Sequence, residues 1–300
     1  MAALSGVHQG LSRVAGFRFR PRDMAAITMT DPVLKTPCSH DALASGLAAG
    51  LAQQGYLFVP AADIQQSWQA WCDGADDSDS FAHSWETLTP DRFMGDGGRY
   101  RRRRHGVFSA RAGASSLSRE PHRPHFQTTH FNQLNGGIAR YFEPVLEESV
   151  ATRTFAFVST LALATFSRLR PQADWHVEMH QFRIEVGGEI AAGLPTPEGL
   201  HRDGVSFVLM MMIIRDNVRE GVSHIHDLDR KRLAEFTLTE RFDMALVDDE
   251  RVLHGVTPIV AADATRGGVR DLLVLTFREQ PLKDQSREAP SRVVSSSSGV

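Results

Sequence analysis

The sequence predicts an α+β, mainly β protein, in which an antiparallel double-sheet barrel carries N-terminal helices packed on one of its sheets. Two observations support this fold class. From Trp175 onward, short apolar runs alternate with turn signals such as Gly187-Gly188, which is typical of antiparallel sheets. Before Trp175, apolar residues recur at helical spacing. The strands expected in the C-terminal half are 176–186, 206–215, 222–227, 235–238, 244–247, 252–260 and 271–279.

The N-terminal half begins with a predicted helix over 39–54. Leu43, Leu47 and Leu51 follow one another at helical spacing, and Gly55 stands where a helix commonly ends. Pro144 is expected in the first turn of a later helix, where its missing amide hydrogen is not needed. The other elements expected in this half are a strand at 56–59, a helix at 63–72, an acidic loop at 73–80, a strand at 99–108 and a helix at 143–168 with one break.

Composition limits the class of protein. With 300 residues, 42% hydrophobic, and a net charge of -3, the chain can form one large domain, and the charge argues against a nucleic-acid partner. The longest apolar run, 207–214, is too short to cross a bilayer as a helix, so no membrane partner is expected. Cys38 and Cys72 have no metal-type spacing, which favours a reducing compartment and a cytoplasmic location.

The expected domain organisation is an extension at 1–35, a single catalytic domain at 36–280 and a disordered tail at 281–300. The first 22 residues contain arginines but no acidic residue, a composition found in organelle transit peptides. The alternatives are a disordered extension or a translation start at Met24 or Met29. The tail is polar and ends in a run of serines, which cannot bury enough apolar surface to become ordered.

A pattern of two histidines, an aspartate and an arginine provides the candidate chemistry. His201 and Asp203 are two residues apart just before a buried strand, and in extended backbone such residues point to the same side. His254 and Arg270 follow in two later predicted strands. Two imidazoles and one carboxylate form the facial triad that binds ferrous iron, with positions left open. Arg270 is placed to clamp a carboxylate-bearing cosubstrate.

Other histidines receive a structural interpretation. His176 and Glu178 form a second His-x-acid pair, but no comparable partners follow them in the sequence, so we interpret them as neighbours on a strand. His122 and His125 lie beside prolines and are interpreted as loop histidines near the mouth of an active site.

Several stretches of the sequence resemble a known family. The most specific are 201–204, 207–214, 247–249, 253–258 and 270–277, and weaker matches occur at 99–101, 126–127, Asn132 with 136–137, and 180–181 with Arg183. Over roughly 39–279 the chain resembles the Fe(II)- and 2-oxoglutarate-dependent dioxygenases, and within them the L-isoleucine dioxygenase-like group of free amino-acid hydroxylases. The loop 219–223 departs from this pattern, because many members would have a second glycine there.

The resemblance implies a fold and a set of site residues. The fold is a double-stranded β-helix, the jelly-roll or cupin-like barrel. The implied iron ligands are His201, Asp203 and His254, and Arg270 matches the arginine that grips the distal carboxylate of 2-oxoglutarate. Thr276 lies on the same strand face and would add a hydroxyl, unless it is a core threonine. The residues implied on the substrate side are Arg101, Gln127, Gln181 and Arg183.

The implied reaction is hydroxylation of an unactivated side-chain carbon of a free aliphatic L-amino acid or close derivative, with sulfoxidation of thioethers as a side activity. It would use Fe(II), 2-oxoglutarate and dioxygen, with ascorbate as reductant. Two alternatives stay open: a non-catalytic sensor barrel, and a hydroxylase or demethylase of a macromolecule steered by the arginine run 101–104. A cupin-type isomerase would not need Arg270. Oligomeric state is left open.

Overall fold

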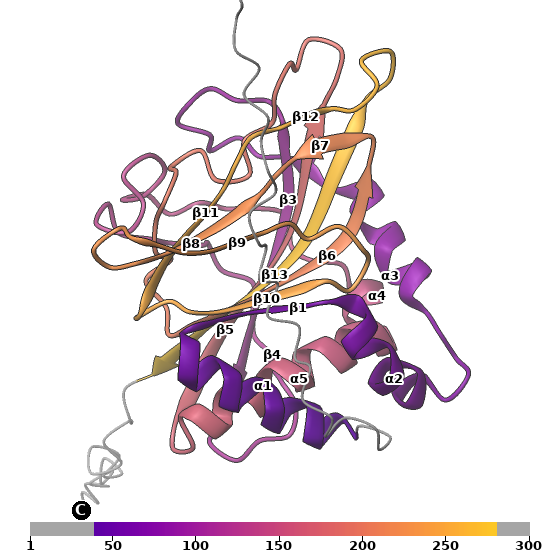
Figure 1. Ribbon diagram of the computed structural model, residues 1–300, viewed down its shortest axis with the longest axis vertical. Coiled ribbons are helices and arrows are strands. Elements are labelled where there is room, and N and C mark those ends of the chain that lie inside the picture. The colour runs from indigo at the N-terminus through magenta and orange to yellow at the C-terminus, as the bar shows by residue number, and fades with distance from the viewer. Residues whose placement is uncertain (1–38, 281–300) are drawn as a thin grey trace, which may run out of the picture. The chain divides into compact units, whose positions relative to one another are not determined.

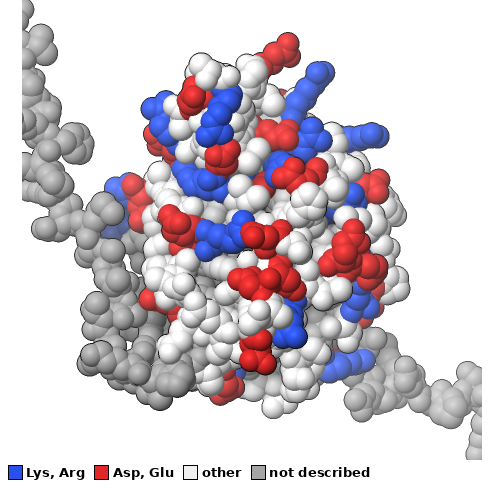
Figure 2. All heavy atoms as spheres, turned by 90° about the vertical axis from the view of Figure 1, so that its right-hand side faces the viewer, with Lys and Arg blue, Asp and Glu red and all other residues white. Residues whose placement is uncertain are grey.

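The structure, a computed structural model, describes residues 39–280. Both the expected N-terminal extension and the serine-rich tail lie outside these residues, as does Cys38, whereas Cys72 is buried and free. Across the described part of the chain, no helix is both long and apolar enough to span a membrane. On the face drawn in Figure 2, acidic and basic side chains are intermixed rather than separated by sign.

The largest element of the fold is an eight-stranded antiparallel sheet. Its strands run in the order β1-β10-β6-β13-β5-β3-β2, and β4 pairs with β3. The longest strands, β5 and β13, pair along their whole length, from Val186 beside Gly268 to Asp174 beside Gln280. The strand bounds are β1 Tyr56–Val59, β2 Thr89–Pro90, β3 Arg101–Ala110, β4 Ser118–Arg119, β5 Asp174–Val186, β6 Phe207–Asp216, β10 Met244–Asp248 and β13 Gly268–Gln280.

Two smaller antiparallel sheets complete the β structure. One has the order β11-β8-β9 and the other pairs β12 with β7. Their bounds are β7 Val218–Glu220, β8 Ser223–Asp227, β9 Arg232–Phe236, β11 Val252–Val256 and β12 Ile259–Ala261. In Figure 1 these short strands lie over one face of the large sheet, while the helices gather on its other side. This arrangement confirms the predicted mainly β, antiparallel double-sheet fold.

The helices cover the outer face of the large sheet. Their bounds are α1 His40–Gln54, α2 Ala61–Cys72, α3 Ser78–His83, α4 Glu147–Val150 and α5 Arg153–Leu169, with a 3-10 helix η2 at Ser84–Thr87. Helix α1 begins at Ser39, whose side chain accepts a hydrogen bond from the amide of Ala42, and ends at Gly55 in the left-handed conformation with φ 79°. The helix predicted over 39–54 is therefore confirmed.

Alternation along the central strands decides which side chains meet the helices and which face the space between the sheets. On β6, Leu209 and Met211 join the core beneath the helices, whereas Val208 and Met212 belong to the second core between the sheets. The apolar run of β6 is thus buried on both faces, as in strands covered on both sides. The same alternation on the neighbouring strand β13 turns Arg270 and Thr276 toward the space between the sheets.

Some predicted elements need correction. Part of the acidic loop expected at 73–80 is the start of α3. The helix expected at 143–168 is divided into α4 and α5, because Thr152 adopts extended backbone and caps α5 with its side chain. Pro144 lies before both helices, where it forms a bridge with His105 of β3. The strand expected at 252–260 divides into β11 and β12 around Pro258, which has no amide hydrogen to donate.

Strand β7 was not predicted. It runs into the loop 219–223, where the sequence departs from the pattern of the family that it resembles. Glu220 has φ 63° and Gly221 has φ 75°, so both residues adopt the left-handed conformation. Only glycine adopts this conformation without steric cost. A glutamate therefore occupies a position where a second glycine would be unstrained.

Candidate active site

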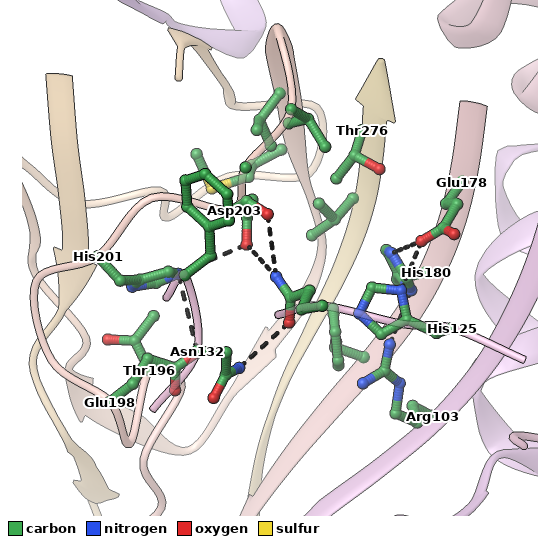
Figure 3. A pocket seen from close by; sticks show the side chains of 18 of the residues that line it. Arg103, His125, Asn132, Glu178, His180, Thr196, Glu198, His201, Asp203 and Thr276 are labelled. Atoms are coloured by element: carbon green, nitrogen blue, oxygen red, sulfur yellow. Dashed lines mark hydrogen bonds and ion pairs between the residues drawn. The ribbon is translucent and has the colours of Figure 1, made fainter. Parts of the chain in front are cut away.

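A cavity of about 310 Å³ lies between the sheets. Its walls come from the inward faces of β5, β6, β11 and β13 and from the loops 123–142 and 195–205. Apolar side chains such as Val208, Met210 and Val274 line part of it, and polar groups converge from the remaining sides. Figure 3 shows these polar side chains, several of which point toward one another.

His201, Asp203 and His254 come together at this cavity. The backbones of His201 and His254 bridge through two hydrogen bonds, of 2.9 and 3.0 Å, which place the two imidazoles side by side. One oxygen of Asp203 lies 3.6 Å from Nε2 of His201, and the other lies 3.5 Å from Nε2 of His254. Ligand atoms about 2.1 Å from a shared ion lie roughly 3.0–3.4 Å apart. These donors therefore fit one metal ion.

Groups behind these three residues hold them in place. The Nδ1 atom of His201 lies 2.9 Å from the carbonyl oxygen of Gly199, so a proton on Nδ1 leaves Nε2 free as a ligand. Asp249 is fully buried, and its Oδ1 lies 3.9 Å from Nδ1 of His254. The Asp249 carboxylate also accepts hydrogen bonds from the backbone amides of residues 203, 204 and 205, at 2.9, 2.8 and 3.2 Å. Asp249 thereby fixes the turn that presents Asp203.

The titratable groups at this site shift one another's pKa values. Burial would lower the pKa of His201, but the hydrogen bond and charge of Asp203 raise it to about 9. Burial and the charge of His201 lower the pKa of His254 to about 4. Burial and the charge of Asp203 raise the pKa of Asp249 to about 7. At neutral pH the site therefore holds a proton on His201, where a metal ion would take its place.

Arg270 is a buried cation without a partner. Its side chain makes no hydrogen bond or ion pair within residues 39–280, and its Nε atom is buried and unsatisfied. Burial, together with the charge of Arg215, lowers its pKa to about 10, so it remains charged at neutral pH. Thr276 is buried on the same wall of the cavity. The guanidinium of Arg270 is buried, faces the cavity and pairs with no carboxylate of the described residues. It therefore fits a ligand that bears a carboxylate.

The arginine run of β3 alternates between two environments. Arg101 and Arg103 are buried, and both lie near Asp91, at 2.8 and 3.8 Å. Arg102 and Arg104 are more exposed and bind groups on the outside of the sheet. The inward half of the run therefore lines the cavity, and the run does not form a continuous basic surface.

Two of the four predicted substrate residues reach the cavity and two do not. Arg101 and Gln127 line it, and the amide nitrogen of Gln127 lies 3.3 Å from an oxygen of Asp203. The expectation for Gln181 and Arg183 is wrong. Gln181 donates to the hydroxyl of Ser84 at 2.8 Å, and Arg183 pairs with Asp271, both away from the cavity. Alternation along β5 turns the residues between them, such as Phe182, inward instead.

A second cluster of titratable side chains was missed by the sequence reasoning. Around Glu178 lie four imidazoles, those of His105, His125, His176 and His180. The interpretation of His176 and Glu178 as a pair without partners is wrong, because His105 and His125 precede them in the sequence and His180 follows them. The alternation of His176, Glu178 and His180 on one strand face was the available signal.

The hydrogen bonds of this cluster indicate that its imidazoles interact with the carboxylate of Glu178 rather than with a second metal ion. Nη2 of Arg103 lies 2.7 Å from Nδ1 of His180, and arginine can only donate. The neutral imidazole of His180 must then carry its proton on Nε2, which lies 3.6 Å from Glu178. His125 Nδ1 lies 2.5 Å from the same oxygen of Glu178. Glu178 thus accepts from the imidazoles of His125 and His176, and those of His105 and His180 lie 3.5 and 3.6 Å away.

Comparison with known proteins identifies the family. The family model described as 2OG-Fe dioxygenase matches residues 82–276. The chain belongs to the 2OG-Fe dioxygenase family. It is 27% identical to 3(1)-hydroxy-L-isoleucine 4-dioxygenase of Pantoea ananatis (strain AJ13355) over 248 residues, which cover 79% of this chain and 96% of that protein.

Solved structures of similar proteins agree with this assignment. The structure of a bsmA homolog from Methylobium petroleophilum PM1 is 34% identical, with a TM-score of 0.69, and the match covers 81% of this chain and 94% of that one. The Fe(II)/(alpha)ketoglutarate-dependent dioxygenase TqaL shares the fold, with 18% identity, a TM-score of 0.60, and coverage of 83% of this chain and 92% of that one. The jelly-roll prediction is confirmed, and the chain is an Fe(II)- and 2-oxoglutarate-dependent oxidoreductase.

Proposed function

We propose that this dioxygenase hydroxylates an unactivated side-chain carbon of a free aliphatic L-amino acid or a close derivative, and that it oxidises thioethers as a side activity. The observation that carries the proposal is the similarity to a dioxygenase named for a hydroxylated isoleucine. The match covers 79% of this chain and 96% of that protein. The cavity supports the same conclusion, because it brings a three-ligand metal site and an unpaired buried arginine together beside apolar walls.

Each group at the cavity has a role in this proposal. His201, Asp203 and His254 would hold Fe(II), and Arg270 would bind the distal carboxylate of 2-oxoglutarate, with the Thr276 hydroxyl as an additional donor. Bound iron, with 2-oxoglutarate and dioxygen, would supply the oxidising power that breaks a carbon–hydrogen bond and would release succinate and carbon dioxide.

The remaining residues orient these groups and keep water out. The carbonyl oxygen of Gly199 orients the imidazole of His201, and the carboxylate of Asp249 holds the turn that presents Asp203. Val208, Met210 and Val274 provide an apolar wall against which an aliphatic side chain can pack. Ascorbate would serve as the reductant that keeps the iron ferrous.

The experiment is a panel of free amino acids incubated with the full chain, Fe(II), 2-oxoglutarate, ascorbate and air. We expect succinate release that depends on an aliphatic amino acid such as isoleucine, leucine or valine, together with a product that has gained one oxygen atom. Methionine tests the thioether activity. If a folded, iron-loaded chain releases no succinate above its substrate-free rate with any of these amino acids, the proposed substrate class is wrong.

A further inference from the structure

Two charged side chains at the cavity have buried polar atoms without a hydrogen-bond partner. Arg140 is 1% exposed, and its side chain makes one hydrogen bond, from Nη2 to Oε1 of Gln127 at 2.8 Å. Its Nε atom is buried without a partner, and it makes no ion pair within residues 39–280. Glu198 also lines the cavity, and its Oε2 atom is buried without a hydrogen bond.

Arg140 lies near two other buried arginines. Arg101 and Arg103, on the neighbouring strand β3, share the single carboxylate of Asp91. Burial and the charge of Arg101 lower the pKa of Arg140, whereas Asp91, Glu198 and Glu178 act in the opposite direction. The buried Nε atom of Arg140 still lacks an acceptor, so this end of the cavity is suited to a carboxylate.

One oxygen of Glu198 lacks a hydrogen-bond donor, whereas the Nε atom of Arg140 lacks an acceptor. The Oε1 atom of Glu198 lies 3.8 Å from Nε2 of His201, whereas its Oε2 atom has no donor within the described residues. Figure 3 shows Glu198 next to His201, on the segment that leads into it. Glu178, by contrast, already accepts hydrogen bonds from His125 and His176.

Both side chains are fixed close to the metal ligands. Gln127 accepts a hydrogen bond from Arg140 and lies within 3.3 Å of Asp203, so it links the arginine to the metal site. The backbone of Arg140 is bridged to that of His125 by hydrogen bonds of 3.0 and 2.9 Å. On the other side, Thr196 binds the backbone of Val256 with bonds of 3.1 and 2.9 Å, which holds the loop carrying Glu198.

We propose that Arg140 and Glu198 form an amino-acid clamp, in which Arg140 binds the carboxylate and Glu198 the ammonium group of an α-amino acid. This proposal rests on the proposed function and adds the way in which the substrate is recognised. Arginine presents two parallel donors to a carboxylate, and a partly exposed carboxylate with a buried, unpaired oxygen accepts from an ammonium group. The clamp places the head of the substrate beside the metal ligands and leaves its aliphatic part for the apolar wall.

The test is a binding experiment without turnover. L-Isoleucine, 3-methylpentanoate, which lacks the amine, and 2-methylbutylamine, which lacks the carboxylate, are titrated by calorimetry into chain loaded with Fe(II) and 2-oxoglutarate in the absence of oxygen. Arg140→Gln should weaken L-isoleucine and 3-methylpentanoate by about 10- to 100-fold and leave 2-methylbutylamine unchanged. Glu198→Gln should weaken L-isoleucine and 2-methylbutylamine by a similar factor and leave 3-methylpentanoate unchanged.

Matched controls come from the outer faces of the neighbouring strands. Arg102 and Glu185 pair with each other at 2.8 Å, and neither lines the cavity, so Arg102→Gln and Glu185→Gln should leave all three affinities unchanged. Affinity for 2-oxoglutarate and Fe(II) is measured for every variant.

The outcomes that overturn the clamp are distinct. If the wild-type chain binds 2-oxoglutarate but no amino acid of the panel, both the proposed function and the clamp fail. If L-isoleucine binds and Arg140→Gln leaves its affinity unchanged, the clamp alone fails. A variant that loses affinity for 2-oxoglutarate or Fe(II), instead of the amino acid, would assign its residue to the cosubstrate or to the metal, and it too would overturn the clamp.

Discussion

Replacing Arg270 with methionine should have two opposite effects, a more stable metal-free protein and a much weaker affinity for 2-oxoglutarate. Methionine keeps most of the apolar stem and removes the buried charge. Because the side chain of Arg270 contacts no carboxylate within the described part of the chain, its removal breaks no ion pair there.

The magnitude follows from the pKa of Arg270. Burial, with the charge of Arg215, lowers that pKa from 12.5 to about 10. The arginine is protonated at pH 7 in both the folded and the unfolded chain, so the lowered pKa means that its charge destabilises the folded state by about 3 kcal/mol. Some of this gain is offset by the packing defect around a smaller side chain. We therefore expect Arg270→Met to raise the free energy of unfolding by about 1–3 kcal/mol at pH 7.

The cosubstrate should respond in the other direction. Losing a buried, charged partner of a carboxylate costs about 2–5 kcal/mol, which corresponds to at least a 30-fold weaker affinity. Two measurements check both effects: thermal unfolding of the metal-free chain, and calorimetric titration of 2-oxoglutarate into the Fe(II)-loaded chain without oxygen. Arg102→Met, on the outer face of the sheet and outside the cavity wall, is the control. An Arg270→Met chain that melts earlier than the wild type and binds 2-oxoglutarate normally would refute the assignment.

Three further predictions concern the metal ligands and their supports. His254→Ala should abolish turnover while the circular dichroism spectrum stays that of the folded chain; turnover near the wild-type rate would remove this residue from the metal site. Because the pKa of His201 is raised to about 9 in the metal-free site, Fe(II) binding at pH 7.5 should release a proton and strengthen as the pH rises toward 9. Calorimetry in buffers of different ionisation enthalpy measures that proton, and an enthalpy that is the same in every buffer would contradict the assignment. Asp249→Ala should weaken Fe(II) binding by about 10- to 100-fold, since it leaves the three backbone amides of the turn that presents Asp203 without their acceptor; unchanged metal affinity would show that the turn is held by other contacts.

Strand patterns predicted the framework of the fold and the inward placement of some residues. The apolar runs of β6 and β13 indicated buried central strands. Residues an even number of positions apart share a strand face, so Arg270 and Thr276 were expected on one face, as the structure places them. Helix α1 was equally clear, since its leucines, its cap and its terminal glycine are all local signals. Local signals were enough wherever neighbouring residues decide the conformation.

Features that depend on contacts between distant parts of the chain could not be predicted from local sequence patterns. Gln181 and Arg183 were assigned to the substrate side because they belong to a matching stretch, but only the packing of η2 against β5 shows which strand face meets the cavity. Arg140 and Glu198 lie on irregular loops with no periodicity, so nothing in the sequence indicated that they reach the same cavity. The histidines around Glu178 come from separate segments, and their meeting depends on the pairing of β3 with β5.

The pairing of His201 with His254 across two backbone hydrogen bonds has a consequence for how such enzymes diversify. One rung of a ladder carries two of the three proposed metal ligands, while Arg140, Gln127 and Glu198 are borne by loops outside that rung. Loops accept insertions and substitutions more readily than paired backbone does. Substitutions in these loops can therefore change the substrate, while the proposed metal ligands stay the same.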